Sequence, residues 1–165
     1  MKSQEDQQQR IQRLKRAAVI AIGLAVPAEG LRQWAYNDTG GILTVCYGHT
    51  GNDFKKGVKY DMAQCKKWLD DDMLNAVLTV ERCVPGLPDN VLAAFGDAVY
   101  NIGPKIACDR QRSTAARKLA AGDITGACNE LPKWNKAKVA GVFITLPGLT
   151  KRRNLEKEIC LEPQL

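Results

Sequence analysis

The sequence predicts an α+β fold that is mainly helical, with a small N-terminal β lobe and a helical C-terminal lobe joined by a long helix. Three observations support this prediction. Short apolar alternations broken by turn residues fill about 31–60. One long amphipathic pattern follows over about 61–83. Shorter helical segments with capping residues then occupy about 89–161. A length of 165 residues suits a single domain, and a cleft between its two lobes is a natural place for a polymer to bind.

The first 28 residues form a tail and an apolar leader ahead of the domain expected at 29–165. Residues 1–16 are polar and Gln-rich, as in a frayed tail or the first turns of a helix. The run AAVIAIGLAVPA at 17–28 has three interpretations: a buried helix that delivers Glu29 to a site, a cleavable signal peptide, or a weak membrane anchor. It is shorter than the roughly 20 apolar residues of a stable span. Cleavage after Ala28 would leave Glu29 without a helix to orient it, so we favour the helix and the weak anchor.

The next segment changes to turn signals spaced for a small antiparallel sheet, among them Asn37-Asp38-Thr39-Gly40-Gly41 and Thr50-Gly51-Asn52-Asp53. Asp61 is a good N-cap, and the pattern predicts a helix over Met62 to Cys83. The run Pro85-Gly86-Leu87-Pro88 ends it.

Asp89 caps a helix expected over Asn90 to Ile102, which is apolar nearly all round and therefore central to the core. Ser113 caps a helix over Thr114 to Ala120, and Asp123 or Thr125 caps another that runs through Leu131. Gly141, Pro147 and Gly148 predict a loop over residues 138–148 before a last, charged helix over Thr150 to Cys160.

The charge and the cysteines narrow the classes of partner and site. A net charge of +6 favours an anionic polymer or surface, while an aromatic content of 6% without basic interleaving argues against nucleic acid. A single histidine and the absence of any CxxC pair make a zinc site improbable.

The cysteines suit either disulfides in an oxidising compartment or buried thiols; they are Cys46, Cys65, Cys83, Cys108, Cys128 and Cys160. Of fifteen connectivities, we favour Cys128 with Cys160, then Cys46 with Cys65, which leaves Cys83 with Cys108.

The stretch EGLRQWAYNDTGGILTVCYGHT at 29–50 holds the candidate chemistry. Taken singly, Glu29 is typical of an exposed helix end, Asp38 of a turn and Thr44 of a strand. Together they offer two carboxyls on different elements and a hydroxyl. Cleaving a sugar bond requires one protonated and one ionised carboxyl, and in an inverting enzyme a water between the base and the sugar. Glu29, Asp38 and Thr44 supply one group for each of these roles.

At this stretch the chain resembles the phage-type lysozymes, the endolysins of glycoside hydrolase family 24, which include T-even phage lysozyme and lambdoid phage endolysins. The family pattern E-G-x(3)-x-x-Y-x-D-x-x-G-x-x-T-x-G-x-G-H-T is matched at Glu29, Gly30, Tyr36, Asp38, Gly41, Thr44, Gly48, His49 and Thr50. Cys46 departs from it, since many members have glycine there and a lambdoid subgroup has cysteine. The blocks VYNIG, RST, AGD, PKW and LPGLTKRRNLEKEIC follow in the family's order, so the resemblance covers roughly 29–161.

The resemblance implies a lysozyme-like fold and a muramidase, which hydrolyses the β-1,4 bond between N-acetylmuramic acid and N-acetylglucosamine. It implies that Glu29 is the general acid, Asp38 the base or electrostatic stabiliser, and Thr44 the hydroxyl that positions water. It also implies ion pairs of Arg152 with Glu29, where Arg153 is the alternative, and of His49 with Asp72. The cleft-lining blocks of the family are matched at Tyr100, Asn101, Ser113 and Thr114.

The expected partner is bacterial peptidoglycan, and we expect a monomer that requires no cofactor and no metal and binds no nucleic acid. The protein would be made in the host cytoplasm and act in the periplasm, causing lysis and phage release. Some related endolysins reach the periplasm through an apolar N-terminal segment and stay tethered until released, so 17–28 is a candidate for transient inner-membrane association. Two alternatives stay open: a wall-binding module without activity, and a lytic transglycosylase, which needs the glutamate but no aspartate base.

Overall fold

The computed structural model describes residues 3–163, and its first element is a helix that reaches the candidate site. Helix α1 spans Gln4–Glu29. Its start is fixed by a capping box, in which the Asp6 backbone N–H donates to the Ser3 hydroxyl and the Ser3 N–H donates to the Asp6 carboxylate. The helix runs unbroken across the expected boundary between residues 28 and 29, so the polar first turns, the apolar run and Glu29 belong to one element.

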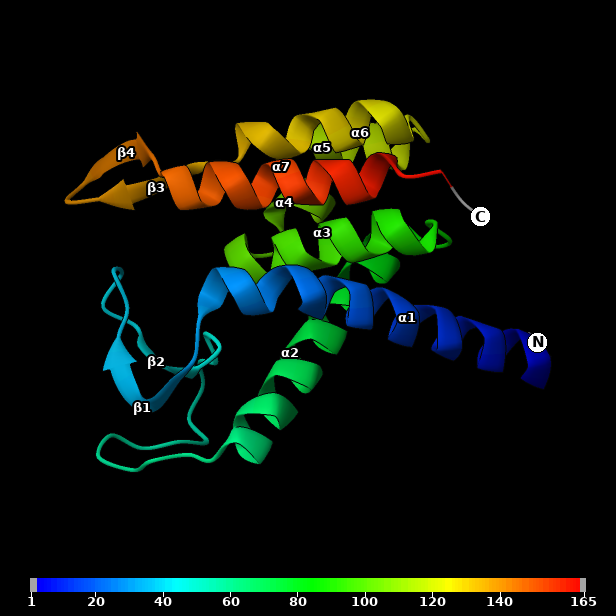
Figure 1. Ribbon diagram of the computed structural model, residues 1–165. Coiled ribbons are helices and arrows are strands. Elements are labelled where there is room, and N and C mark those ends of the chain that lie inside the picture. The colour runs from blue at the N-terminus through cyan, green and yellow to red at the C-terminus, as the bar shows by residue number, and fades with distance from the viewer. Residues whose placement is uncertain (1–2, 164–165) are drawn as a thin grey trace.

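Helix α3, Asp89–Ile102, is the centre of the helical lobe. Ten of its fourteen residues are buried, because α1, α2 (Met62–Cys83) and α7 (Pro147–Leu161) all pack against it. α1 contributes a face of small residues, and Leu14, Ala17, Ala18, Ala21 and Ala25 are buried in the main core. Figure 1 shows α1 (blue) and α7 (orange to red) on either side of α3, with α5 and α6 beyond α7. The apolar run is therefore part of the core in this structure.

The β lobe is an antiparallel pair of strands, β1 at Arg32–Asn37 and β2 at Leu43–Cys46. Gly30 has a φ of +68°, which favours glycine and lets the chain leave α1 for β1 within two residues. Cys46 has a φ of +58° although it is not glycine. This conformation explains why glycine suits the position, and here the disulfide with Cys65 also holds it.

Helix α2, Met62–Cys83, connects the lobes with the predicted bounds and the predicted Asp61 cap, whose side chain accepts from the Gln64 backbone N–H. Three disulfides join the elements in the pairs that we favoured. Cys46–Cys65 ties β2 to α2, Cys83–Cys108 ties α2 to α4, and Cys128–Cys160 ties α6 to α7. Their Cα–Cα distances are 5.1, 5.4 and 5.6 Å, within the usual range for disulfides.

The rest of the helical lobe consists of short helices and one long one. α4 spans Lys105–Cys108, α5 Thr114–Ala120, α6 Ile124–Glu130 and a 3₁₀ turn Leu131–Lys133. The side chains of Ser113 and Asp123 cap α5 and α6. The last helix, α7, spans Pro147–Leu161 and so begins three residues before the predicted Thr150, with its proline in the first turn, where no N–H is needed.

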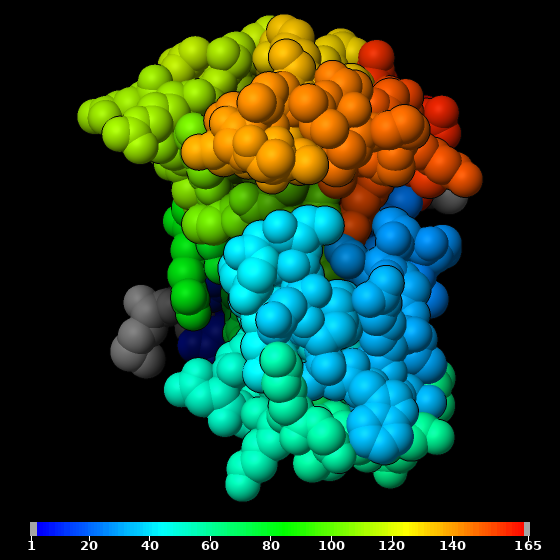
Figure 2. All heavy atoms as spheres, turned by 90° about the vertical axis from the view of Figure 1, so that its left-hand side faces the viewer, coloured from blue at the N-terminus to red at the C-terminus, as the bar shows by residue number. Residues whose placement is uncertain are grey.

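The prediction of a loop over residues 138–148 is wrong. The chain instead forms a hairpin of β3, Lys136–Val139, and β4, Val142–Thr145. Its two turn residues, Ala140 and Gly141, both have positive φ, as a two-residue type I′ turn requires. Figure 2 shows this hairpin (orange) above the β lobe (cyan), with a hollow between the two lobes.

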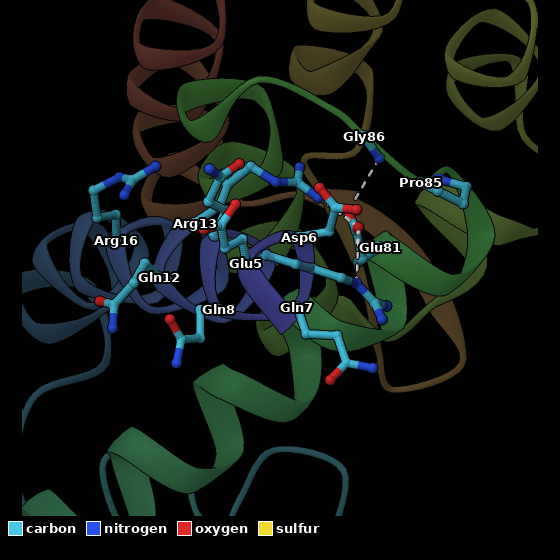
Figure 3. A pocket seen from close by; sticks show the side chains of 12 residues that line it. Glu5, Asp6, Gln7, Gln8, Gln12, Arg13, Arg16, Glu81, Pro85 and Gly86 are labelled. Atoms are coloured by element: carbon cyan, nitrogen blue, oxygen red, sulfur yellow. Dashed lines mark hydrogen bonds and ion pairs between the residues drawn. The ribbon is translucent and has the colours of Figure 1, made fainter. Parts of the chain in front are cut away.

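Arginines on the N-terminal half of α1 hold it to the end of α2. Glu81 is 2% exposed and accepts from Arg13 at 2.5 Å and Arg10 at 3.4 Å, while Arg13 also donates to the Leu87 carbonyl. Arg16 pairs with Asp89 at the start of α3. Figure 3 shows this region, where Arg13 and Glu81 face each other beside the loop that carries Pro85 and Gly86. Across residues 3–163, no helix is long and apolar enough to cross a membrane.

Candidate active site

Glu29 is the last residue of α1 and lies where α1, α3, α7 and the β lobe approach one another. Its Oε1 accepts from Arg152 Nη1 of α7 at 2.5 Å and from Asn101 Nδ2 of α3 at 3.4 Å. A Cβ atom at Gly48 would lie 3.4 Å from Glu29 Oε2, and Gly48 has a φ of +84°. The positive φ therefore favours glycine at this position, where the 47–50 turn lies against the carboxyl. The Glu29 side chain keeps 22% of its surface exposed, so the carboxyl is held but accessible.

Asp38 lies in the turn between β1 and β2. Its Oδ1 accepts from the backbone N–H groups of Gly40 and Ile42, both at 2.8 Å, which is the turn geometry that its sequence context predicts. Thr44 lies in β2 and is 3% exposed. It is therefore buried, whereas a threonine in a strand usually faces solvent. Its hydroxyl donates to the Ile42 carbonyl at 2.9 Å, within the same turn. The turn thus fixes the positions of both side chains.

Tyr36 of β1 lies near both carboxyls. It lies opposite Thr44 in the strand register. Burial is the main cause that raises the pKa of Tyr36; the Arg32 charge lowers it, and the charges of Glu29 and Asp38 raise it further. Glu29 of the helical lobe and Asp38 of the β lobe are thus both near enough for their charges to act on this one phenol. The Arg32 guanidinium stacks over the Tyr36 ring at 4.3 Å.

The expected cleft residues have different environments. The Tyr100 hydroxyl donates to the Tyr47 carbonyl, and burial, with the nearby Glu29 charge, raises the pKa of Tyr100. Asn101 bridges Glu29 and Arg153, since its amide Nδ2 donates to the first and its Oδ1 accepts from the second. Ser113 is fully buried; its hydroxyl donates to the Ile106 carbonyl and accepts from the Ala116 N–H, so the structure does not bring it to an open surface. Thr114 is exposed on α5 and accepts from Arg117.

Both expected ion pairs are present. Of the two candidate arginines, Arg152 contacts Glu29, whereas Arg153 pairs with Glu156 at 2.6 Å. His49 Nδ1 lies 2.7 Å from Asp72 Oδ2 on α2. The structure adds a second acid that the sequence did not reveal, because His49 Nε2 lies 2.9 Å from Asp53 Oδ1. The Trp68 ring stacks on His49 at 4.5 Å, and its indole N–H donates to Asp53.

Asp97 is the site residue that sequence reasoning missed. It is fully buried in α3 and accepts two hydrogen bonds from Arg152. The only signal was a single acid in the middle of a helix that is otherwise apolar nearly all round, a position where a charge requires a partner. In the part of the chain that the structure describes, no three histidine, cysteine or acidic side chains gather in a group that could hold a metal ion.

This arrangement, a carboxyl at the end of a helix and an acid in the turn of a small sheet, is that of a lysozyme-type glycosidase. The family model described as phage lysozyme matches residues 27–156, and the chain belongs to the phage lysozyme family. It is a peptidoglycan-lysing glycoside hydrolase.

Three relatives illustrate the similarity. A SAR-endolysin of bacteriophage PS119 is 37% identical over 81% of this chain and 76% of its own. The endolysin of Escherichia coli O157:H7 phage FAHEc1 has a TM-score of 0.72 at 30% identity, covering 89% of this chain and 91% of its own. The active form of P1 phage endolysin Lyz has a TM-score of 0.73 at 25% identity, covering 86% and 83%.

Proposed function

We propose that this endolysin hydrolyses the β-1,4 bond between N-acetylmuramic acid and N-acetylglucosamine with inversion, using Glu29 as general acid and Asp38 as base. The proposal rests on one observation. The two carboxyls belong to different lobes and have different partners: a guanidinium and an amide for Glu29, two backbone amides for Asp38. Two carboxyls in different environments can divide the roles of acid and base.

In the proposed reaction Glu29 gives its proton to the leaving glycosidic oxygen. Asp38 takes a proton from water on the opposite face of the sugar, and the hydroxyl of Thr44 helps to position that water. Thr44 suits this role because it follows the Asp38 turn at the start of β2, and its hydroxyl, which donates to the Ile42 carbonyl, can still accept a hydrogen bond from that water. An inverting enzyme keeps its two carboxyls about 6.5–9.5 Å apart so that the water fits between them.

Replacing Glu29 by Gln keeps the shape of the side chain and removes its acidic proton. We expect Glu29→Gln to lower lysis of outer-membrane-permeabilised Gram-negative cells by about a hundredfold to ten-thousandfold, the usual contribution of a general acid. Loss of turbidity measures the rate, and circular dichroism checks the fold. Glu158→Gln is the matched control, since it makes the same chemical change at an exposed glutamate of α7. A fully active Glu29→Gln protein would overturn the assignment.

We further propose that the enzyme acts on the wall in the periplasm. Three disulfides support an oxidising compartment, and a net charge of +6 favours association with the anionic wall.

Residues 17–28 are proposed to associate transiently with the inner membrane before α1 packs into the core. Opposite its buried alanine face, α1 exposes Val19 at 69% and Val26 at 36%, so this run is apolar all round. Val19→Asp tests the tether, since an acid within an inserted apolar helix is unfavourable, by up to about 2.5–3.5 kcal/mol at its centre. We expect this variant to leave the membrane fraction of expressing cells while wild type remains there. Val142→Asp, at an exposed valine of the hairpin, is the control. Equal fractionation of wild type and Val19→Asp would contradict the tether.

A further inference from the structure

A cluster of charges is buried between α3 and α7, directly behind Glu29. Arg152, Arg153 and Glu156 come from α7, and Asp97 comes from α3. The side chains of Asp97, Glu156 and Arg153 are 0% exposed and that of Arg152 is 4% exposed. Water therefore cannot screen these charges, and each one requires compensation from its neighbours.

Asp97 occupies most of the hydrogen-bonding edge of Arg152. Arg152 Nε donates to Asp97 Oδ2 at 2.9 Å, and Arg152 Nη2 donates to Asp97 Oδ1 at 2.7 Å. This two-bond arrangement is the strong geometry between a guanidinium and a carboxylate. Nη1 takes no part in this pair and donates to Glu29 instead. Glu29 therefore contacts a guanidinium whose charge another carboxylate already balances.

The pKa of Arg152 reflects the same division of partners. Burial alone would lower it, but the hydrogen bonds and charge of Asp97 raise it, and Glu29 adds a smaller increase, so that the net shift is upward. Asp97 is thus the main partner of Arg152 and Glu29 the secondary one. Behind this pair, Arg153 and Glu156 form a second guanidinium–carboxyl pair.

A general acid must keep its proton until the glycosidic oxygen takes it. An uncompensated guanidinium in contact with Glu29 would favour the ionised form, which has no proton to give. We propose that Asp97 is a positioning residue that neutralises Arg152 and directs its free N–H to Glu29, so that Glu29 is oriented by Arg152 without being forced to ionise. This inference rests on the proposed role of Glu29 as the acid.

Other titratable groups surround Glu29 and Arg152, and the variants of the test described below leave them in place. They are Arg153 and Glu156 of α7, Tyr100 of α3 and Tyr36 of β1. Burial, and then the neighbouring Asp97, raises the pKa of Glu156 well above its usual range. Asp97→Asn removes one negative charge from the surroundings of Arg152 and Glu29 while nearly preserving the side-chain shape.

The test is the pH profile of kcat/KM, measured with soluble peptidoglycan fragments as substrate. The alkaline limb of this profile reports the pKa of the general acid in the free enzyme. We expect Asp97→Asn to move the alkaline limb to lower pH by about one unit or more. The acid limb should stay in place, because Asp38 lies in the other lobe. Asp89→Asn makes the same chemical change at the partly exposed start of α3 and should move neither limb.

A double variant shows whether Asp97 acts through Arg152. In Asp97→Asn/Arg152→Gln both charges of the pair are gone, so we expect the alkaline limb at or above its wild-type position. A limb below wild type in the double variant would overturn the inference, even if Asp97→Asn alone failed to fold. An alkaline limb of Asp97→Asn at the wild-type position would also overturn it. If Glu29→Gln is inactive in either of these outcomes, the proposed function stands and only the role of Asp97 fails.

Discussion

His49 binds the β lobe to the connecting helix through two carboxylates at once. Its ring nitrogens face Asp72 of α2 and Asp53 of the following loop, and only the imidazolium can donate to both. Burial by itself would lower the pKa of His49, but the hydrogen bonds and charges of Asp72 and Asp53 outweigh it and raise the pKa. The protonated form is therefore the one that stabilises this contact.

Stability should depend on pH through His49. Because its pKa is raised in the folded protein, folding favours proton uptake. The stabilisation is full below the unfolded pKa of 6.5 and is lost as the pH rises through the folded value. We expect the thermal midpoint of wild type to fall over this window, measured by circular dichroism. His49 is the only histidine, so His49→Asn should remove this slope.

The same variant should also lower the free energy of unfolding by about 2 kcal/mol at pH 5, the usual contribution of hydrogen bonds to charged groups. Urea unfolding at pH 5 and at pH 9 measures both effects. A His49→Asn protein that keeps the wild-type pH slope would show that another group causes it.

Helix α1 carries the proposed catalytic acid, so its packing decides where that acid lies. Its alanine face packs against α3, and its arginines contact Glu81 at the end of α2. The side chain of Glu81 is 3% exposed, whereas those of Arg13 and Arg10 are 20% and 48% exposed. The carboxylate therefore depends on these arginines more than they depend on it.

Glu81→Gln should loosen the N-terminal half of α1. It removes the charge that two arginines share, and we expect a loss of about 1–3 kcal/mol in the free energy of unfolding. Amide hydrogen exchange should rise in the first half of α1. Arg16→Gln breaks the more exposed pair with Asp89 and should cost no more than about 1 kcal/mol. Equal losses in the two variants would mean that Glu81 has no special part in holding α1.

Local patterns in the sequence predicted much of this molecule. The periodicity and cap of α2 gave its bounds, and Ser113 marked the start of α5. The hairpin of β3 and β4 was missed because Gly141, Pro147 and Gly148 suggested a loop. Its pairing, for example of Lys138 with Phe143, depends on partners that no periodicity reveals across so short a run.

In the candidate site, too, local features could be predicted and contacts between distant residues could not. Glu29, Asp38 and Thr44 lie in one continuous stretch whose spacing is visible in the sequence. Asp97 and Arg152 are 55 residues apart, and their contact forms only when α7 packs against α3. Ser113 shows the opposite case, since its place in a family block suggested a cleft residue while folding buries it as a helix cap.

Product analysis tests the central claim most directly, namely that Glu29 and Asp38 hydrolyse the glycan. Peptidoglycan digested by wild type and by Glu29→Gln would be compared by mass spectrometry of the released muropeptides. We expect wild type to release products with reducing ends, heavier by one water than anhydro forms, and Glu29→Gln to release almost none. Anhydro products from wild type, or reducing ends from Glu29→Gln at the wild-type rate, would contradict the account.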